Sequence, residues 1–142
     1  VDGYIWSTKE KIAGLRFKAR VNGKEIFPEG GDPAIQDSIP GTLHISWPLT
    51  SFAGTLVMDI DEQQIKIKLN SREPVDWFLE LTTADHASLP FKNITAKRVD
   101  CRFEGMDYQV TTTKGNFSKP ASGSVFRITP EMSSVILNFG YL

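Results

Sequence analysis

Hydrophobic and polar residues alternate along most of this chain, a pattern typical of β-strands with one buried and one exposed face. In residues 13–21 the apolar positions alternate with Gly14, Arg16, Lys18 and Arg20. Asn22-Gly23 follows, and this pair favours a type I′ turn because both central residues of that turn take positive φ. The pattern therefore predicts a hairpin in which Lys24–Phe27 is the returning strand.

The same alternation continues to the end of the chain. It predicts further strands within 42–47, 56–60, 65–69, 75–81, 99–103, 108–112, 126–128 and 135–139. Residues 28–41 contain three prolines and three glycines, which predicts a long loop. Residues 83–90 are also expected to form a loop, with room for one helical turn at 84–88.

Short strands separated by turns at this spacing indicate an all-β fold. We predict one domain over residues 1–142, an antiparallel two-sheet β-sandwich, jelly-roll-like or Ig-like, of about nine or ten strands. A closed lipid-binding barrel is the rival, but it usually has a start helix or a glycine-rich opening strand. The predicted core residues share the apolar faces: Leu15, Phe17, Leu43, Ile45, Trp47, Ile67, Trp77, Leu79, Cys101, Phe103 and Leu137.

Composition narrows the function classes. The chain has 142 residues, 40% of them hydrophobic, which is ordinary for a globular domain, and its net charge of −1 disfavours general nucleic-acid binding. No apolar run is long enough for a membrane span. A single cysteine excludes an internal disulfide and a Cys-rich metal site. Because the chain begins at Val1 without a signal segment, we expect it to be part of a longer protein.

Two groups of polar residues could carry chemistry. Asp59 and Asp61 share one face of a predicted strand and could bind calcium or act as acid and base, although an acidic, solvent-exposed turn explains them better. His44 is expected to point outward, and His86 follows Asp85 in a loop, with no accompanying nucleophile motif. We therefore predict no catalytic residue, metal or cofactor.

Cations follow two of the predicted strands. Arg16, Lys18 and Arg20 project from one strand face, and Lys66 and Lys68 project from another. If these strands were neighbours, five cations would line one sheet face and could attract an anionic glycan or phosphate. Acidic residues on facing strands would cancel that charge. Outward charges on a half-solvated sheet are ordinary, and this is the interpretation we favour.

The amino-terminal aromatic residues are the predicted ligand-binding site. Tyr4 and Trp6 flank Ile5, so an inward Ile5 would leave both rings exposed on one side. Exposed aromatic faces can stack on sugar rings. They can equally pack against a neighbouring domain, and the sequence does not favour sugar binding over domain packing.

Three segments give the chain a resemblance to known proteins. Residues Leu15–Ile26, Ser124–Pro130 and Ser134–Gly140 are similar to hairpins and closing strands of accessory β-sandwich domains in glycoside hydrolases. The resemblance implies a non-catalytic module of a larger periplasmic or extracellular protein. Its expected partners are a polysaccharide or glycan and neighbouring domains of the parent chain. The alternative is a structural or adhesion-like domain that only packs against its neighbours.

Overall fold

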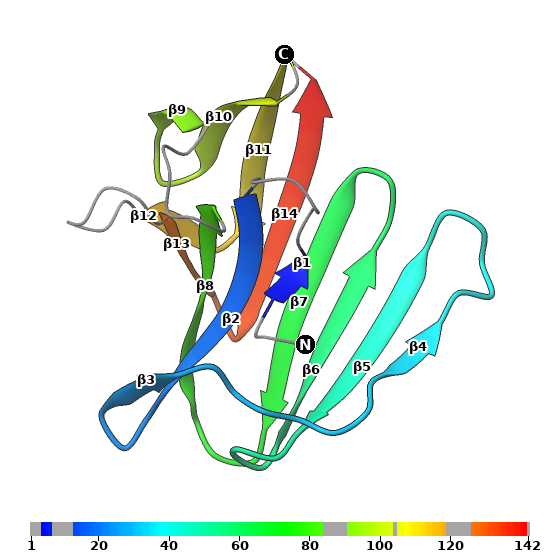
Figure 1. Ribbon diagram of the computed structural model, residues 1–142, viewed down its shortest axis with the longest axis vertical. Helices are drawn as coiled ribbons and strands as arrows, with labels where there is room; N and C mark the ends of the chain where they lie inside the picture. Colours follow the sequence, from blue (N-terminus) through cyan, green and yellow to red (C-terminus); the bar gives the residue numbers. More distant parts are fainter. Residues whose placement is uncertain (1–3, 7–12, 84–90, 104, 119–125, 142) are drawn as a thin grey trace.

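The computed structural model describes residues 4–6, 13–83, 91–103, 105–118 and 126–141, and in these the chain forms an antiparallel β-sandwich (Figure 1). The six-stranded sheet has the order β1-β2-β8-β13-β12, with β3 also paired to β2. Its strands are β1 (Tyr4–Trp6), β2 (Ala13–Val21), β3 (Lys24–Ile26), β8 (Asp76–Thr83), β12 (Asn116–Ser118) and β13 (Phe126–Thr129).

The eight-stranded sheet has the order β4-β5-β6-β7-β14-β11-β10-β9. Its strands are β4 (Ala34–Gln36), β5 (Leu43–Leu49), β6 (Gly54–Ile60), β7 (Gln64–Ser71), β9 (Phe91–Ile94), β10 (Arg98–Phe103), β11 (Met106–Lys114) and β14 (Ser134–Tyr141). The described residues contain fourteen strands, more than the predicted nine or ten, and the strands that were not predicted are the short β4, β9 and β12. The predicted all-β, two-sheet class is confirmed.

The core lies between the two sheets. Buried apolar side chains of β2, β8, β12 and β13 form one cluster with those of β5, β6, β7, β10, β11 and β14. In this cluster the Phe17 and Trp77 rings lie 5.6 Å apart at 57°. Burial is confirmed for six of the predicted core residues: Leu15, Phe17, Ile67, Trp77, Leu79 and Leu137.

Three predicted core residues on β5 are only half-buried, namely Leu43, Ile45 and Trp47. Figure 1 shows the reason: β4 and β5 extend past the strands of the six-stranded sheet. Alternation identified the correct face of β5, but the core covers that face only in part: Leu49 is buried, and Ile45 and Trp47 pack at the margin of the core. The side chains of Cys101 and Phe103 lie outside the described part of the structure.

The predicted loop at 28–41 is more ordered than expected. It contains β4, which pairs with residues 44–46 of β5, and Gly30 forms an isolated bridge to Leu49. The Trp47 indole N–H donates to the Gly31 carbonyl at 2.9 Å, and Gly31 N–H donates to the Pro48 carbonyl at 2.9 Å. These bonds attach the segment to β5. Of the predicted loop at 83–90, residues 84–90 lie outside the described residues.

Two turns depend on backbone conformations that favour glycine. Asn22 and Gly23 have φ of 53° and 78°, as the predicted type I′ hairpin between β2 and β3 requires. Gly115, with φ of 113°, lies between β11 and β12 and takes the chain from the eight-stranded to the six-stranded sheet. A Cβ at Gly115 would lie 3.0 Å from the Thr129 carbonyl oxygen, so this crossing is also tightly packed.

Candidate functional site

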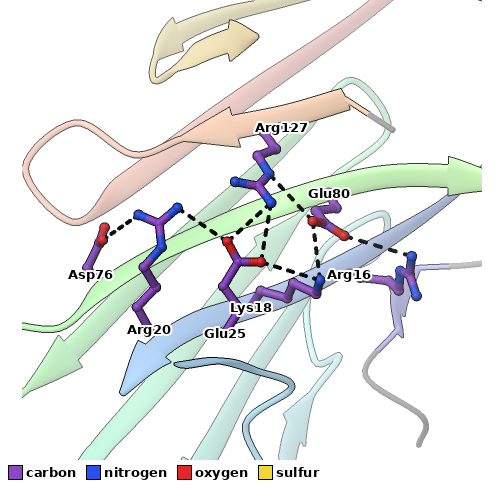
Figure 2. A network of polar contacts seen from close by, with 7 residues as sticks. All are labelled: Arg16, Lys18, Arg20, Glu25, Asp76, Glu80 and Arg127. Atoms are coloured by element: carbon purple, nitrogen blue, oxygen red, sulfur yellow. Dashed lines mark hydrogen bonds and ion pairs between the residues drawn. The ribbon is translucent and has the colours of Figure 1, made fainter. Parts of the chain in front are cut away.

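The outer face of the six-stranded sheet carries a compact group of charged side chains. Alternate residues of β2 and β8 point away from the core, and Arg127 of β13 lies beside them. The β2–β3 hairpin adds Glu25 (Figure 2). We call the seven residues drawn there the outer-face cluster: Arg16, Lys18, Arg20, Glu25, Asp76, Glu80 and Arg127.

Glu80 is the most deeply buried carboxylate of this cluster. Its residue is 4% exposed, although it lies on the face opposite the core. Lys18 Nζ lies 3.4 Å from its carboxylate, Arg127 Nε 3.6 Å and Arg16 3.8 Å. A buried carboxylate is costly unless it is paired, and these three cations provide that pairing. Glu80 is therefore the fixed anionic centre of the outer-face cluster.

Glu25 enters the cluster from the short strand β3. Arg20 donates to its carboxylate at 3.3 Å, and one guanidinium nitrogen of Arg127 lies 3.2 Å from both oxygens. Lys18 Nζ lies 3.8 Å away. Desolvation, the largest single influence, raises the pKa of Glu25, but Arg127, Arg20 and Lys18 together lower this pKa below its ordinary value. Glu25 therefore stays ionised under all but acidic conditions.

Aromatic rings help to place the arginines. The guanidinium groups of Arg127 and Arg20 lie 4.4 Å and 5.3 Å from the ring centroid of Phe78, which is buried on the outer face. Arg20 also donates to Asp76 at 2.8 Å, and this hydrogen bond is the main cause of its raised pKa. Arg16 and Lys18 lie about as close to the Phe27 ring, at 5.1 Å and 4.9 Å.

The cluster differs from the sequence prediction in its membership. Lys66 and Lys68 belong to β7 in the other sheet, so the five cations do not line one face. Acidic residues do offset the β2 cations, through Glu25, Asp76 and Glu80. Sequence analysis missed Arg127 and Glu25, which are 102 residues apart and meet only in the folded chain.

The two carboxylates predicted to share one strand face, Asp59 and Asp61, have different roles, because β6 ends at Ile60 and Asp61 lies beyond it. Asp59 faces His44 across the β5–β6 ladder, and its carboxylate lies 2.5 Å from His44 Nδ1. Asp61 instead accepts hydrogen bonds from the backbone N–H groups of Gln63 and Gln64, both at 2.8 Å. Asp61 thus stabilises the β6–β7 turn, which agrees with the acidic-turn interpretation. Asp85 and His86 lie outside the described residues.

A second candidate site is a group of aromatic side chains on β11 and β14 of the eight-stranded sheet. Along β14 the core-facing positions become progressively exposed: Leu137 is 1% exposed, Phe139 39% and Tyr141 72%. Tyr141 stands directly opposite Tyr108 of β11, and their rings lie 5.3 Å apart at 36°. The Tyr108 hydroxyl also lies 3.7 Å from the sulfur of the exposed Met106. We call Met106, Tyr108, Phe139 and Tyr141 the aromatic platform.

The predicted ligand-binding residues Tyr4 and Trp6 belong to β1, an edge strand of the six-stranded sheet. In the backbone ladder Tyr4 is opposite Arg16 and Trp6 is opposite Leu15. The register shifts between these two pairs, which interrupts the alternation on which the predicted shared face depends. Their side chains lie outside the described part of the structure, so their role stays a prediction.

Comparisons with known protein families, curated proteins and solved structures found no match to this chain. Within the described ranges, no helix is long and apolar enough to cross a membrane. In the same ranges, no group of three or more His, Cys, Asp or Glu side chains is placed to hold a metal ion.

Proposed function

We propose that this domain is a non-catalytic, carbohydrate-associated β-sandwich module of a larger exported protein, and that the aromatic platform contacts the glycan. The paired rings of Tyr108 and Tyr141 are the observation that carries this proposal. Sugar rings present apolar C–H groups on their faces and hydroxyls at their rims. Aromatic rings stack on the first, and the tyrosine hydroxyls can hydrogen-bond to the second.

Exposure supports this use of the platform. Phe139 and Tyr141 continue the apolar side of β14 beyond the buried core, so several apolar groups lie together in water. Burying such surface contributes roughly 25 cal/mol per Å², which favours a ligand or partner that covers it. The resemblance of three segments to accessory domains of glycoside hydrolases is an independent reason to expect a glycan.

The alternative partner is a neighbouring domain of the parent protein. A structural or adhesion-like domain would cover the same platform permanently, without binding free sugar. The two proposals therefore differ in whether the isolated domain responds to soluble glycans.

A glycan array followed by titration with soluble oligosaccharides tests the proposal. Saturable binding is expected, with a large loss of affinity in Tyr141→Ala and Tyr108→Ala. The matched control is Ile35→Ala, an exposed apolar residue on β4, at the far edge of the same sheet. No binding to any glycan would favour the packing domain, whereas binding that is equally weakened by Ile35→Ala would contradict the aromatic platform as the contact site.

Trp6→Ala extends the same experiment to the amino-terminal strand. If Tyr4 and Trp6 contribute to the glycan site, Trp6→Ala should remove a ligand-dependent change in tryptophan fluorescence while leaving the free energy of unfolding nearly unchanged. A loss of several kcal/mol of stability would instead place Trp6 in the core of the sandwich.

A further inference from the structure

The Glu25 carboxylate is surrounded by cationic side chains. Two guanidinium groups and one ammonium group converge on it, from Arg20, Arg127 and Lys18. Arginine and lysine arranged around one carboxylate form the usual protein site for an acidic ligand group. In this molecule the carboxylate comes from the protein's own β2–β3 hairpin.

The three cations do not depend on Glu25 for their positions. Arg20 is held by Asp76 at 2.8 Å and by the face of Phe78. Arg127 lies over the same ring and 3.6 Å from Glu80, whose carboxylate also lies 3.4 Å from Lys18. Removing the Glu25 carboxylate would therefore leave a prearranged group of donors, which lowers the cost of binding a replacement.

Charge favours such a replacement. Without Glu25, the cations Lys18, Arg20 and Arg127 would face two carboxylates of the cluster, Asp76 and Glu80. An additional anion would then reduce the excess positive charge at a partly buried site.

The hairpin that carries Glu25 is short and exposed. Its strand β3 has three residues, and the turn residues Asn22 and Gly23 are exposed. Within the described residues, β3 pairs only with Ala19, Arg20 and Val21 of β2. Short, exposed hairpins open at lower free energy than core strands.

We propose that Lys18, Arg20 and Arg127 form a binding site for a carboxylate group of a ligand, and that Glu25 fills this site when the ligand is absent. The site is separate from the aromatic platform and does not depend on the proposed glycan contact there. Binding requires the ligand carboxylate to displace Glu25, so the wild-type protein binds more weakly than a variant that lacks this charge.

Titration calorimetry with oligogalacturonate, a glycan that carries carboxylate groups, tests this site. The methyl ester of the same oligomer lacks the charge and serves as the ligand control. Glu25→Gln should bind the acid form about tenfold more tightly than wild type, and added salt should weaken binding. Adding Arg127→Gln to Glu25→Gln should abolish the gain. Adding Lys68→Gln, on the other sheet, should preserve it and thereby control for net charge.

The proposal is wrong if folded Glu25→Gln binds no better than wild type, or if the ester binds as well as the acid. If Glu25→Gln does not fold, the wild-type protein still decides the question. Excess oligogalacturonate should then shift the guanidinium Nε–H resonances of Arg20 and Arg127 in NMR spectra, and unchanged resonances would overturn the proposal. Tyr141→Ala should leave this binding intact, so failure of the glycan proposal is distinguishable from failure of this one.

Discussion

Gly30 lies against Trp47 so closely that a methyl group on its Cα would fall 2.5 Å from the indole Nε1. The same contact region includes the hydrogen bond from Trp47 to Gly31. The loop between β3 and β4 thus needs glycine for space at this position.

We therefore expect Gly30→Ala to lower the free energy of unfolding by about 1–3 kcal/mol, because the added carbon must displace the indole or the loop backbone. Urea unfolding followed by tryptophan fluorescence measures this change. Gly31→Ala is the matched control, since its Cβ would lie 3.6 Å from Pro48, at ordinary contact distance. Equal effects of the two substitutions would contradict the steric explanation.

Leu79→Ala tests the core between the sheets. Leu79 is fully buried on β8, opposite Phe17 on one side and Ile128 on the other. Truncation should cost about 2–5 kcal/mol through lost burial and a cavity. Ile35→Ala, at an exposed position, should change stability by less than about 0.5 kcal/mol. A small effect of Leu79→Ala in calorimetric or denaturant unfolding would contradict the described packing.

Glu131 predicts a dependence of stability on pH. Its pKa is lowered, first by a hydrogen bond from Lys97 Nζ at 2.6 Å and then by the charge of Lys97. A carboxyl whose folded pKa lies below its unfolded value stabilises the fold above the unfolded value, and this contribution is lost as pH falls through the folded pKa. The stability difference between wild type and Glu131→Gln should therefore be larger at about pH 7 than at about pH 3.

Denaturant unfolding at both pH values measures this difference. Glu73→Gln, in the exposed turn between β7 and β8, provides the comparison. A difference between wild type and Glu131→Gln that does not change with pH would show that the carboxylate charge of Glu131 does not stabilise the fold.

Cys101 remains a predicted core residue, and its chemistry can be measured directly. In the backbone ladder it stands opposite Tyr108 of the aromatic platform. If its thiol is buried, a thiol reagent should label the native domain far more slowly than the unfolded chain, and Cys101→Ser should be destabilising. Rapid labelling of the native domain at neutral pH would contradict burial.

The alternation of apolar and polar residues was sufficient to predict the strands whose apolar face packs against the opposite sheet. Leu15 and Phe17 on β2, and Leu79 on β8, are buried as the pattern predicts. The same pattern misjudged Ile45, because burial there depends on how far the opposing sheet extends. Alternation identifies a face but contains no information about that extent.

The outer-face cluster was less predictable than the strands. The cations of β2 are visible in the sequence as alternate residues, but their acidic partners come from two other strands, β3 and β8. Whether a carboxylate cancels a cation depends on strand order, and no local pattern specifies that β8 lies next to β2 and β13 next to β8. Strands β4 and β12 were missed for a simpler reason, since three residues are too few to establish alternation.

The short length of edge strand β4 affects whether copies of this domain can aggregate when they are held close together. An open sheet edge can recruit a strand from another molecule and begin aggregation. Here Pro33 directly precedes β4, Pro40 follows shortly after it, and only three residues offer backbone groups for pairing. Proline cannot donate a backbone hydrogen bond, so this edge is too short and too interrupted to extend. High local concentrations of the domain should therefore not join eight-stranded sheets through β4.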